Sequence, residues 1–255
     1  MRIYLDFVIR DLGFTLLVNY HTMENLPLHV SLIFTAVVFT VFGFLFYASY
    51  RAFETPKRFG STLTVSALMG WLLLTGALTH KGFFEHIGMP PRLMLFVAPI
   101  LILILVLLIL PKTRAFLLQM PITTLTYIHL VRVPVEICLW WLFGAGLVAE
   151  EMTFEGANFD ILAGITAPFA GVFLVGKKSS NKFGAIVWNL VSLGLLLNIV
   201  IRAISLTPYF YDGSGTELMN TAIFYVPFVW LPLFVVPAVL FSHLVSLVKL
   251  FGKEE

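Results

Sequence analysis

The sequence predicts an all-α integral membrane protein, a bundle of seven transmembrane helices. Hydrophobic residues make up 59% of the 255 residues and charged residues only 12%, which is about half the charged share of a soluble domain. The apolar residues also fall into separate runs that are long enough to cross a bilayer as helices. Composition and run length together exclude a soluble globular domain.

The apolar runs divide the chain into one transmembrane domain with two short flanking segments. We predict spans over residues 28–50, 60–80, 92–111, 120–147, 159–176, 182–206 and 222–250. Their connections are short, so residues 28–250 form a single domain. Residues 1–27 carry Asp6, Arg10 and Asp11, which interrupt any signal-peptide core, and we expect an interfacial helix there. Residues 251–255 are expected to form a cytoplasmic tail.

The distribution of basic residues predicts the orientation of the bundle. Cytoplasmic loops of membrane proteins are enriched in lysine and arginine. Here the basic residues follow the first, third, fifth and seventh spans: Arg51, Lys57, Arg58, Lys112, Arg114, Lys177, Lys178, Lys182, Lys249 and Lys253. The alternate connections are richer in carboxylates. The pattern predicts an outside N-terminus and a cytoplasmic C-terminus.

The fourth span carries charges at membrane depth. His129, Arg132 and Glu136 in "HLVRVPVE" are spaced i, i+3, i+7 and share one helix face. An unpaired charge at that depth costs about 2.5–3.5 kcal/mol, so this face is predicted to point into the bundle. Pro134 also removes the helical partner of the Leu130 carbonyl. A kinked helix of this kind can line a polar cavity, or it can serve structure alone.

The sixth span offers polar groups at a similar depth. Asn198 and Arg202 share one face of this span. We therefore predict an outward-facing ligand-binding seam formed by His129, Arg132, Glu136, Asn198 and Arg202. In the alternative interpretation, Arg132 and Glu136 form a pair that only braces the helices, and Arg202 extends to the outer headgroups.

The fifth and seventh spans contain helix-breaking and close-packing residues. In the fifth, Asn158 is a candidate N-cap and Asp160 lies in the first turn, where the helix dipole favours an anion. The same span has a stripe of small residues for close packing. The seventh span cannot be regular in its outer part, because three prolines interrupt it at intervals of five residues: Pro227, Pro232 and Pro237.

Cofactor signals are weak. A covalent retinal is excluded because no lysine lies near mid-membrane. Regular helical rise places His243 about 8 Å closer to the cytoplasm than His129, which does not favour a bis-histidine haem. The outer side holds a set of weak metal-ligand candidates without a diagnostic spacing: His80, His86, Glu150, Glu151, Glu155 and Asp160. No basic patch suggests nucleic acid.

Two stretches, "EEMTFEGANFDILAGITAP" and "YVPFVWLPLFVVPAVLFSHL", resemble a family of uncharacterised bacterial multi-pass membrane proteins. The resemblance covers about Pro121 to Ser246 and includes "RVPVE". An arginine is expected where Ala157 stands. The resemblance implies a bacterial cytoplasmic membrane protein and no particular activity.

The sequence therefore predicts a non-enzymatic bundle whose outward polar cavity binds or translocates a small polar or anionic ligand or a lipid headgroup. Arg132 and Arg202 would attract the anion, and Asn198 would orient it. Glu136 would set the charge balance or carry a proton. Two alternatives stay open: an intramembrane enzyme that uses outer histidines and carboxylates with a metal, and an accessory subunit whose polar seam only braces helices.

Overall fold

The structure is a computed structural model and describes residues 23, 26–53, 57–86, 89–176, 179–208, 210 and 220–252. The interfacial helix predicted for residues 1–27 lies almost entirely outside the described residues. So do residues 253–255 of the predicted tail.

The described chain is helical apart from one two-residue strand pair. Six of its helical segments are long and apolar enough to cross a membrane, which indicates a membrane protein. They are α1 (Leu28–Ala52), α2 (Lys57–His80, apolar from Gly60), α3 (Arg92–Ile109), α5 with α6 (Ile122–Gly144), α8 (Lys182–Ser205) and the segment that ends in α9 (Leu231–Phe251).

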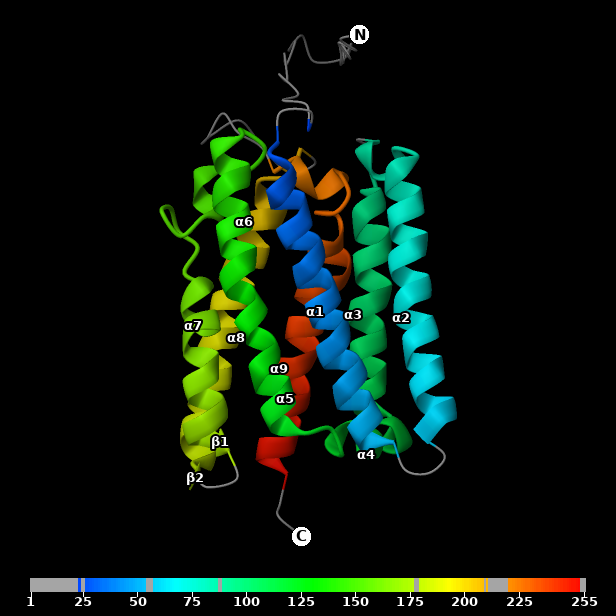
Figure 1. Ribbon diagram of the computed structural model, residues 1–255, viewed down its shortest axis with the longest axis vertical. Coiled ribbons are helices and arrows are strands. Elements are labelled where there is room, and N and C mark those ends of the chain that lie inside the picture. The colour runs from blue at the N-terminus through cyan, green and yellow to red at the C-terminus, as the bar shows by residue number, and fades with distance from the viewer. Residues whose placement is uncertain are drawn as a thin grey trace, which may run out of the picture.

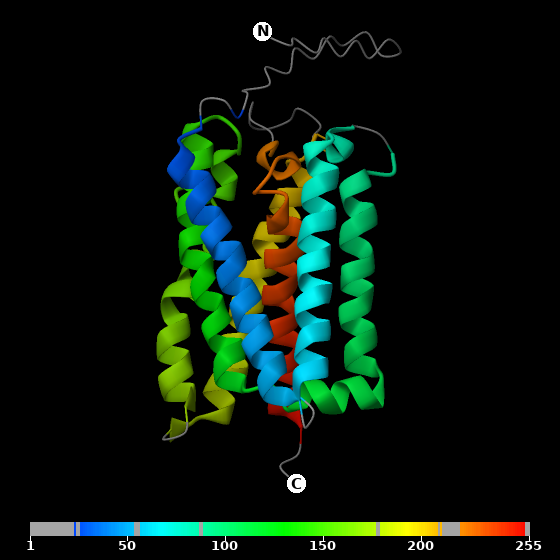
Figure 2. The ribbon, with the colours of Figure 1, turned by 45° about the vertical axis from the view of Figure 1, so that its right-hand side comes forward.

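The helices run roughly parallel to one long axis (Figures 1 and 2). We call the end where α1 begins the upper end, as drawn in Figure 1. The chain passes down α1, up α2 and down α3, and α4 (Pro111–Leu118) then crosses the lower end. It climbs again through α5 (Ile122–Tyr127) and α6 (Arg132–Gly144). Helix α4 is not among the elements predicted from the sequence, because eight residues with two charges do not form an apolar run.

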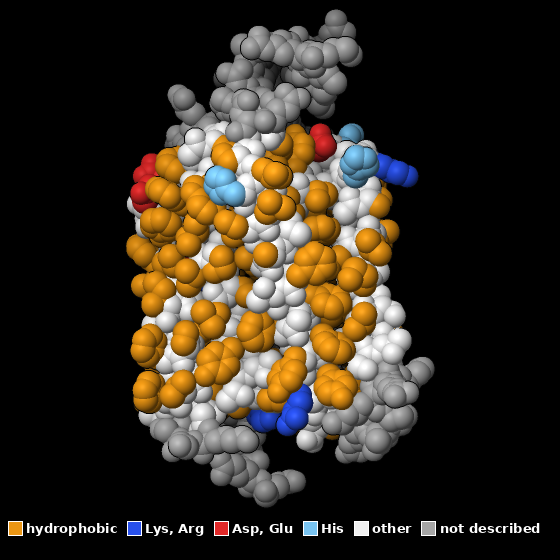
Figure 3. All heavy atoms as spheres, viewed as in Figure 1, with side chains coloured by type: hydrophobic (Ala, Val, Ile, Leu, Met, Phe, Trp, Pro, Cys, Tyr) orange, Lys and Arg blue, Asp and Glu red, His pale blue; other side chains and the backbone are white. Residues whose placement is uncertain are grey.

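Apolar side chains cover the middle of the face seen in Figure 3, and charged side chains lie at its two ends. Many large apolar side chains of the bundle are exposed, among them Leu73 and Ile201, at 66% and 63%. Large exposed apolar surfaces are unfavourable in water and favourable in lipid. The surface thus agrees with a bundle that is solvated by hydrocarbon around its middle.

The fifth predicted span is shorter than expected. It consists of α7 (Ile161–Phe169) and a π-helical continuation, Ala170–Leu174, and leads into β1 (Val175–Gly176), which pairs with β2 (Ser179–Ser180). At 1.5 Å per residue such a helix reaches about 21 Å, less than a hydrocarbon core of about 30 Å. In Figure 1, α7 begins well below the upper ends of α6 and α8.

The chain between α6 and α7 descends from the upper end to this deep starting point. We call residues 145–160 the descending segment. It contains one 3-10 turn, Glu150–Met152, and is otherwise irregular. Irregular backbone at membrane depth requires partners from protein or from a wet cavity. The descending segment must therefore be bonded to its neighbours, and its contacts define the candidate site.

Proline breaks the helical pattern where the sequence predicted it. A 3-10 turn, Ile128–Val131, precedes Pro134, and a π-helical stretch, Leu231–Val235, precedes Pro237. Pro237 cannot donate to the carbonyl of Leu233, and the indole of Trp71 in α2 donates to that oxygen instead, at 2.8 Å. The prediction that the proline-rich first part of the last span is irregular is confirmed.

Small residues let α7 approach α6 closely. Ala163, Ala167 and Gly171, the predicted small-residue stripe, are all buried. Gly164 is closer still: a methyl group there would lie 2.8 Å from Cγ2 and 2.9 Å from the backbone nitrogen of Val133. A side chain at position 164 would therefore push apart the helices that carry Arg132 and Asp160.

Substituting Gly164→Ala should destabilise the bundle by about 1–3 kcal/mol, because it overpacks a contact with backbone. The control is Gly194→Ala in α8, where an added methyl meets nothing within 4 Å. Thermal unfolding of purified protein in detergent compares the two variants. Equal midpoints for both would contradict the close packing of α7 on α6.

Candidate functional site

Arg132 lies at the centre of a buried polar network. Its side chain is almost completely buried, at 2% exposure. Nε donates to Oδ2 of Asp160 at 2.6 Å, and Nη2 donates both to Oδ1 of Asp160 and to the carbonyl of Ser192, the latter at 3.0 Å. The expected partner, Glu136, forms no ion pair with it. The interpretation of an Arg132–Glu136 pair is therefore wrong, and Asp160 is the counter-charge.

Arg132 pairs with Asp160 and not with Glu136 because of the depth at which α7 begins. Asp160 was expected in the first turn of the fifth span, on the outer side of the membrane. In the structure it is the residue immediately before α7, at the N-cap, and Asn158 lies outside the helix. Oδ1 of Asn158 accepts a hydrogen bond from the backbone nitrogen of Asp160 at 3.0 Å. This contact orients the carboxylate while the short helix brings it down to Arg132.

Glu136 has a different partner from the same segment. It is 1% exposed, and both of its carboxylate oxygens lie within hydrogen-bond distance of Nδ2 of Asn158, at 2.6 and 2.7 Å. The same amide nitrogen donates to the carbonyl of Met152 at 2.9 Å. Arg132 and Glu136 thus both face protein, as predicted, but the descending segment rather than α6 supplies their partners.

The descending segment also connects the buried centre to α8. Nδ2 of Asn198 donates to the carbonyl of Ala157 at 3.0 Å, and Nε of Arg202 donates to Oδ1 of Asn198 at 3.1 Å. Residues 157–160 therefore bond to α6 and α8 through Ala157, Asn158 and Asp160. From the sequence, Asn158 was predicted only as a helix cap. The signal for its deeper role was a fifth apolar run too short to cross the membrane.

His129 and His243 form the lower part of the network. Their rings are stacked with centroids 3.9 Å apart, so the predicted 8 Å difference in depth is wrong. The last span is not one regular α-helix, because residues 226–229 form turns and Leu231–Val235 is π-helical, so a rise of about 1.5 Å per residue does not apply along it. Axial imidazoles bind haem iron from opposite faces through nitrogen, and two rings stacked face to face leave no room for it.

The hydrogen bonds of His243 fix its tautomer. Nε2 lies 3.4 Å from Nη1 of Arg132, which can only donate. Nδ1 lies 3.0 Å from Oδ1 of Asn189, which can only accept. His243 is therefore a neutral ring with its proton on Nδ1. His129 is fully buried, and neither of its ring nitrogens has a hydrogen-bond partner among the described residues.

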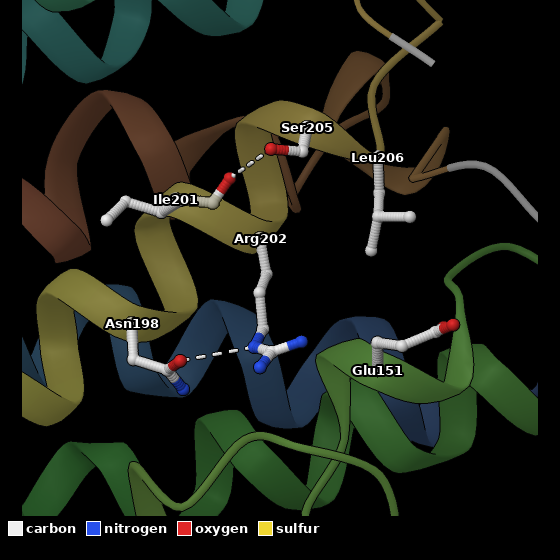
Figure 4. Close-up of a pocket in the computed structure, with 6 residues that line it drawn as sticks. All are labelled: Glu151, Asn198, Ile201, Arg202, Ser205 and Leu206. Atoms are coloured by element: carbon white, nitrogen blue, oxygen red, sulfur yellow. Dashed lines mark hydrogen bonds between the residues drawn. The ribbon is translucent and has the colours of Figure 1, made fainter. Parts of the chain in front are cut away.

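Arg202 lines a pocket of about 430 Å³ near the upper end, which we call the Arg202 pocket (Figure 4). Its wall consists of Glu151 from the descending segment and one face of α8: Asn198, Ile201, Arg202, Ser205 and Leu206. Figure 4 shows the arginine extending from α8 toward the segment that carries Glu151. Apart from the hydrogen bond from Nε to Asn198, the guanidinium forms no hydrogen bond or ion pair with another described residue.

A second cavity, of about 120 Å³, lies on the other face of α8. Its wall is mainly apolar and includes Glu136, Asp160 and Asn220. The single seam predicted from the sequence is thus divided: Arg132 and His129 are enclosed, Glu136 borders the smaller cavity, and Asn198 and Arg202 line the larger pocket. That pocket is bounded by α8 and the descending segment, whereas the smaller cavity is bounded by the predicted spans four, six and seven, through Glu136, Leu196 and Leu231, and by α3.

The weak metal-ligand candidates do not lie close together in the structure. His80, His86, Glu150 and Glu155 are exposed, Asp160 is paired with Arg132, and Glu151 lines the Arg202 pocket. Over the described ranges, no three His, Cys, Asp or Glu side chains lie close enough to share a metal ion.

Fold and site define a helical membrane protein with a buried ionic network and a polar pocket near one end. Residues 89–251 match the model of a family described as a domain of unknown function, DUF8737. The match covers well over half of the chain, so the chain belongs to this family. The matched region includes α3 to α9 and every residue of the buried network. Neither a curated protein nor a solved structure matches the chain.

Proposed function

We propose that the chain is a seven-span protein of a bacterial cytoplasmic membrane, with the upper end outside. In this topology α7 and the descending segment together make the fifth crossing. Basic residues near the lower end support the orientation by the positive-inside rule: Arg51, Lys112, Arg114, Lys182 and Lys249. The loop with Glu150, Glu151 and Glu155 belongs to the opposite, outer side.

The protein binds a phosphate-bearing headgroup or a similar small polar anion in the Arg202 pocket. The observation that carries this proposal is a guanidinium held by Asn198 in a pocket of about 430 Å³, with its terminal nitrogens unpaired to any described carboxylate. Arginine binds phosphate through just these terminal donors. The volume falls within the range of ordinary ligand pockets, about 300–1,000 Å³.

The other residues of the predicted seam support the pocket and do not contact the ligand. Arg132 is already neutralised by Asp160, and Glu136 is bonded to Asn158. These closed contacts favour a second candidate function as well, a purely structural subunit whose network braces helices. The two candidates differ at Arg202, because bracing requires no ligand there.

Binding of phosphatidylglycerol and phosphatidylethanolamine, which both carry a phosphodiester, tests the proposal. Native mass spectrometry of delipidated protein titrated with each lipid gives the apparent Kd. Arg202→Gln should weaken both by about tenfold, since a charged hydrogen bond contributes about 1.5–3 kcal/mol. The matched control is Arg92→Gln, an upper-end arginine that donates to the carbonyl of Phe83. Equal binding by Arg202→Gln and wild type would leave the bracing function standing.

A further inference from the structure

The Arg202 pocket contains a carboxylate as well as a cation, and the two are not paired. Among the described residues the only ion pair is Arg132–Asp160, so the Arg202 nitrogens lie beyond salt-bridge distance of Glu151. Both residues nevertheless line the same pocket, from two different elements (Figure 4). The pocket therefore presents separated positive and negative groups.

Glu151 has an unsatisfied buried oxygen. Its Oε2 atom is covered by protein and has no hydrogen-bond partner in the described structure, and in Figure 4 the carboxylate points away from the guanidinium of Arg202. Leaving a buried charged acceptor without a donor is unfavourable. Rotation of the Glu151 side chain between staggered rotamers would turn the carboxylate toward a donor that enters the pocket.

Each charge alone disfavours one class of ligand. A simple anion that binds Arg202 is repelled by Glu151, and a simple cation that binds Glu151 is repelled by Arg202. A ligand with a phosphate at one end and a primary ammonium at the other satisfies both groups. Charge complementarity of this kind gives specificity more than raw affinity.

The surroundings indicate that this ligand is a lipid headgroup. Ile201, on the wall of the pocket, is 63% exposed on the apolar outside of the bundle. Hydrocarbon chains attached to the phosphate could lie along this lipid-facing surface of α8 while the headgroup enters the pocket. A free phospho-amine has the same charges but lacks these chains.

We propose that the Arg202 pocket selects a zwitterionic headgroup of the phosphatidylethanolamine type: Arg202 binds the phosphate and Glu151 accepts hydrogen bonds from the primary ammonium. This inference rests on the proposed function and names the class of ligand for the same pocket. It predicts a selectivity that an arginine acting alone does not produce.

The test compares three lipids with identical acyl chains by native mass spectrometry of the full chain. Phosphatidylethanolamine should bind about tenfold more tightly than phosphatidylcholine, whose trimethylammonium has no N–H to donate. It should also bind more tightly than phosphatidylglycerol, which has no positive charge. If soluble glycerophosphoethanolamine displaces the lipid at an equal concentration, the recognition of phosphate and ammonium is supported, and the natural ligand is a free phospho-amine.

Glu151→Gln should reverse the preference. Binding of phosphatidylethanolamine falls about tenfold, whereas binding of phosphatidylglycerol rises because the repelling charge is gone. A gain in binding cannot result from misfolding. The control, Glu150→Gln, changes the neighbouring exposed carboxylate, which does not line the pocket, and should leave the wild-type order of affinities.

Equal wild-type affinity for the three lipids, or the same response from Glu150→Gln and Glu151→Gln, would overturn the zwitterion proposal. If Arg202→Gln still weakens the binding of every phospholipid in that case, the proposed binding of a headgroup stands without the selectivity for a zwitterion. If Arg202→Gln has no effect, both fail.

Discussion

Asp160→Asn should lower the free energy of unfolding by about 3–5 kcal/mol, because it leaves the guanidinium of Arg132 buried without its counter-charge. Arg132 is 2% exposed and its only ion pair within the described chain is with Asp160. For a chain of this size the loss corresponds to a fall in the thermal midpoint on the order of 10 °C. Thermal unfolding in detergent or nanodiscs measures it.

The double variant Arg132→Met with Asp160→Leu should be more stable than Asp160→Asn alone, since replacing both members of a buried pair by apolar groups is far less costly than removing one. Glu155→Gln provides the control, because this exposed carboxylate belongs to the same descending segment but is outside the network. A midpoint for Asp160→Asn within error of Glu155→Gln would show that Arg132 has another partner.

Asn158→Leu should cost about 3 kcal/mol or more. It keeps the branched shape of the side chain but removes the one hydrogen-bond donor that reaches the buried carboxylate of Glu136 among the described residues, and the acceptor for the backbone nitrogen of Asp160. One unpaired neutral group costs about 1–3 kcal/mol, and a charged group costs more. The descending segment should also become more accessible, which protease sensitivity or hydrogen exchange of residues 145–160 can follow.

A double-mutant cycle separates this coupling from a general loss of packing. Asn158→Leu and Glu136→Leu should be strongly non-additive, because each removes the same interaction. Asn158→Leu combined with Glu155→Leu should be additive, since no hydrogen bond among the described residues joins these two side chains. Additivity in both cycles would mean that Asn158 does not hold Glu136.

Apolar run length predicted most of the helical bundle. About 20 apolar residues are required for a span, and the described part of the chain contains six such helices. The proline positions likewise predicted where the last span becomes irregular. The short helix α4 was not predicted, because eight residues with two basic side chains do not form a run typical of a transmembrane span. The depth of His243 was misjudged because the last span, with turns at residues 226–229 and a π-helical stretch, does not rise about 1.5 Å per residue throughout. Periodicity does not reveal such irregular turns.

The burial of Arg132 and Glu136 was predictable, but their partners were not. Burial follows from the cost of exposing a charge to lipid, whereas partner choice depends on tertiary position. Asp160 was placed near the surface because every apolar run was assumed to start at the membrane boundary. The fourteen helical residues Ile161–Leu174 do not reach from one membrane boundary to the other. Irregular chain covers the remaining distance. Asn158, between the two, could be identified only once that chain was placed.

An experimental structure in nanodiscs that contain phosphatidylethanolamine tests the central functional proposal most directly. We expect phosphate density within hydrogen-bond distance of the terminal nitrogens of Arg202, with the ammonium toward Glu151 and acyl chains along Ile201. A structure in which Arg202 is paired with a carboxylate of the protein, and no headgroup occupies the pocket, would contradict the account.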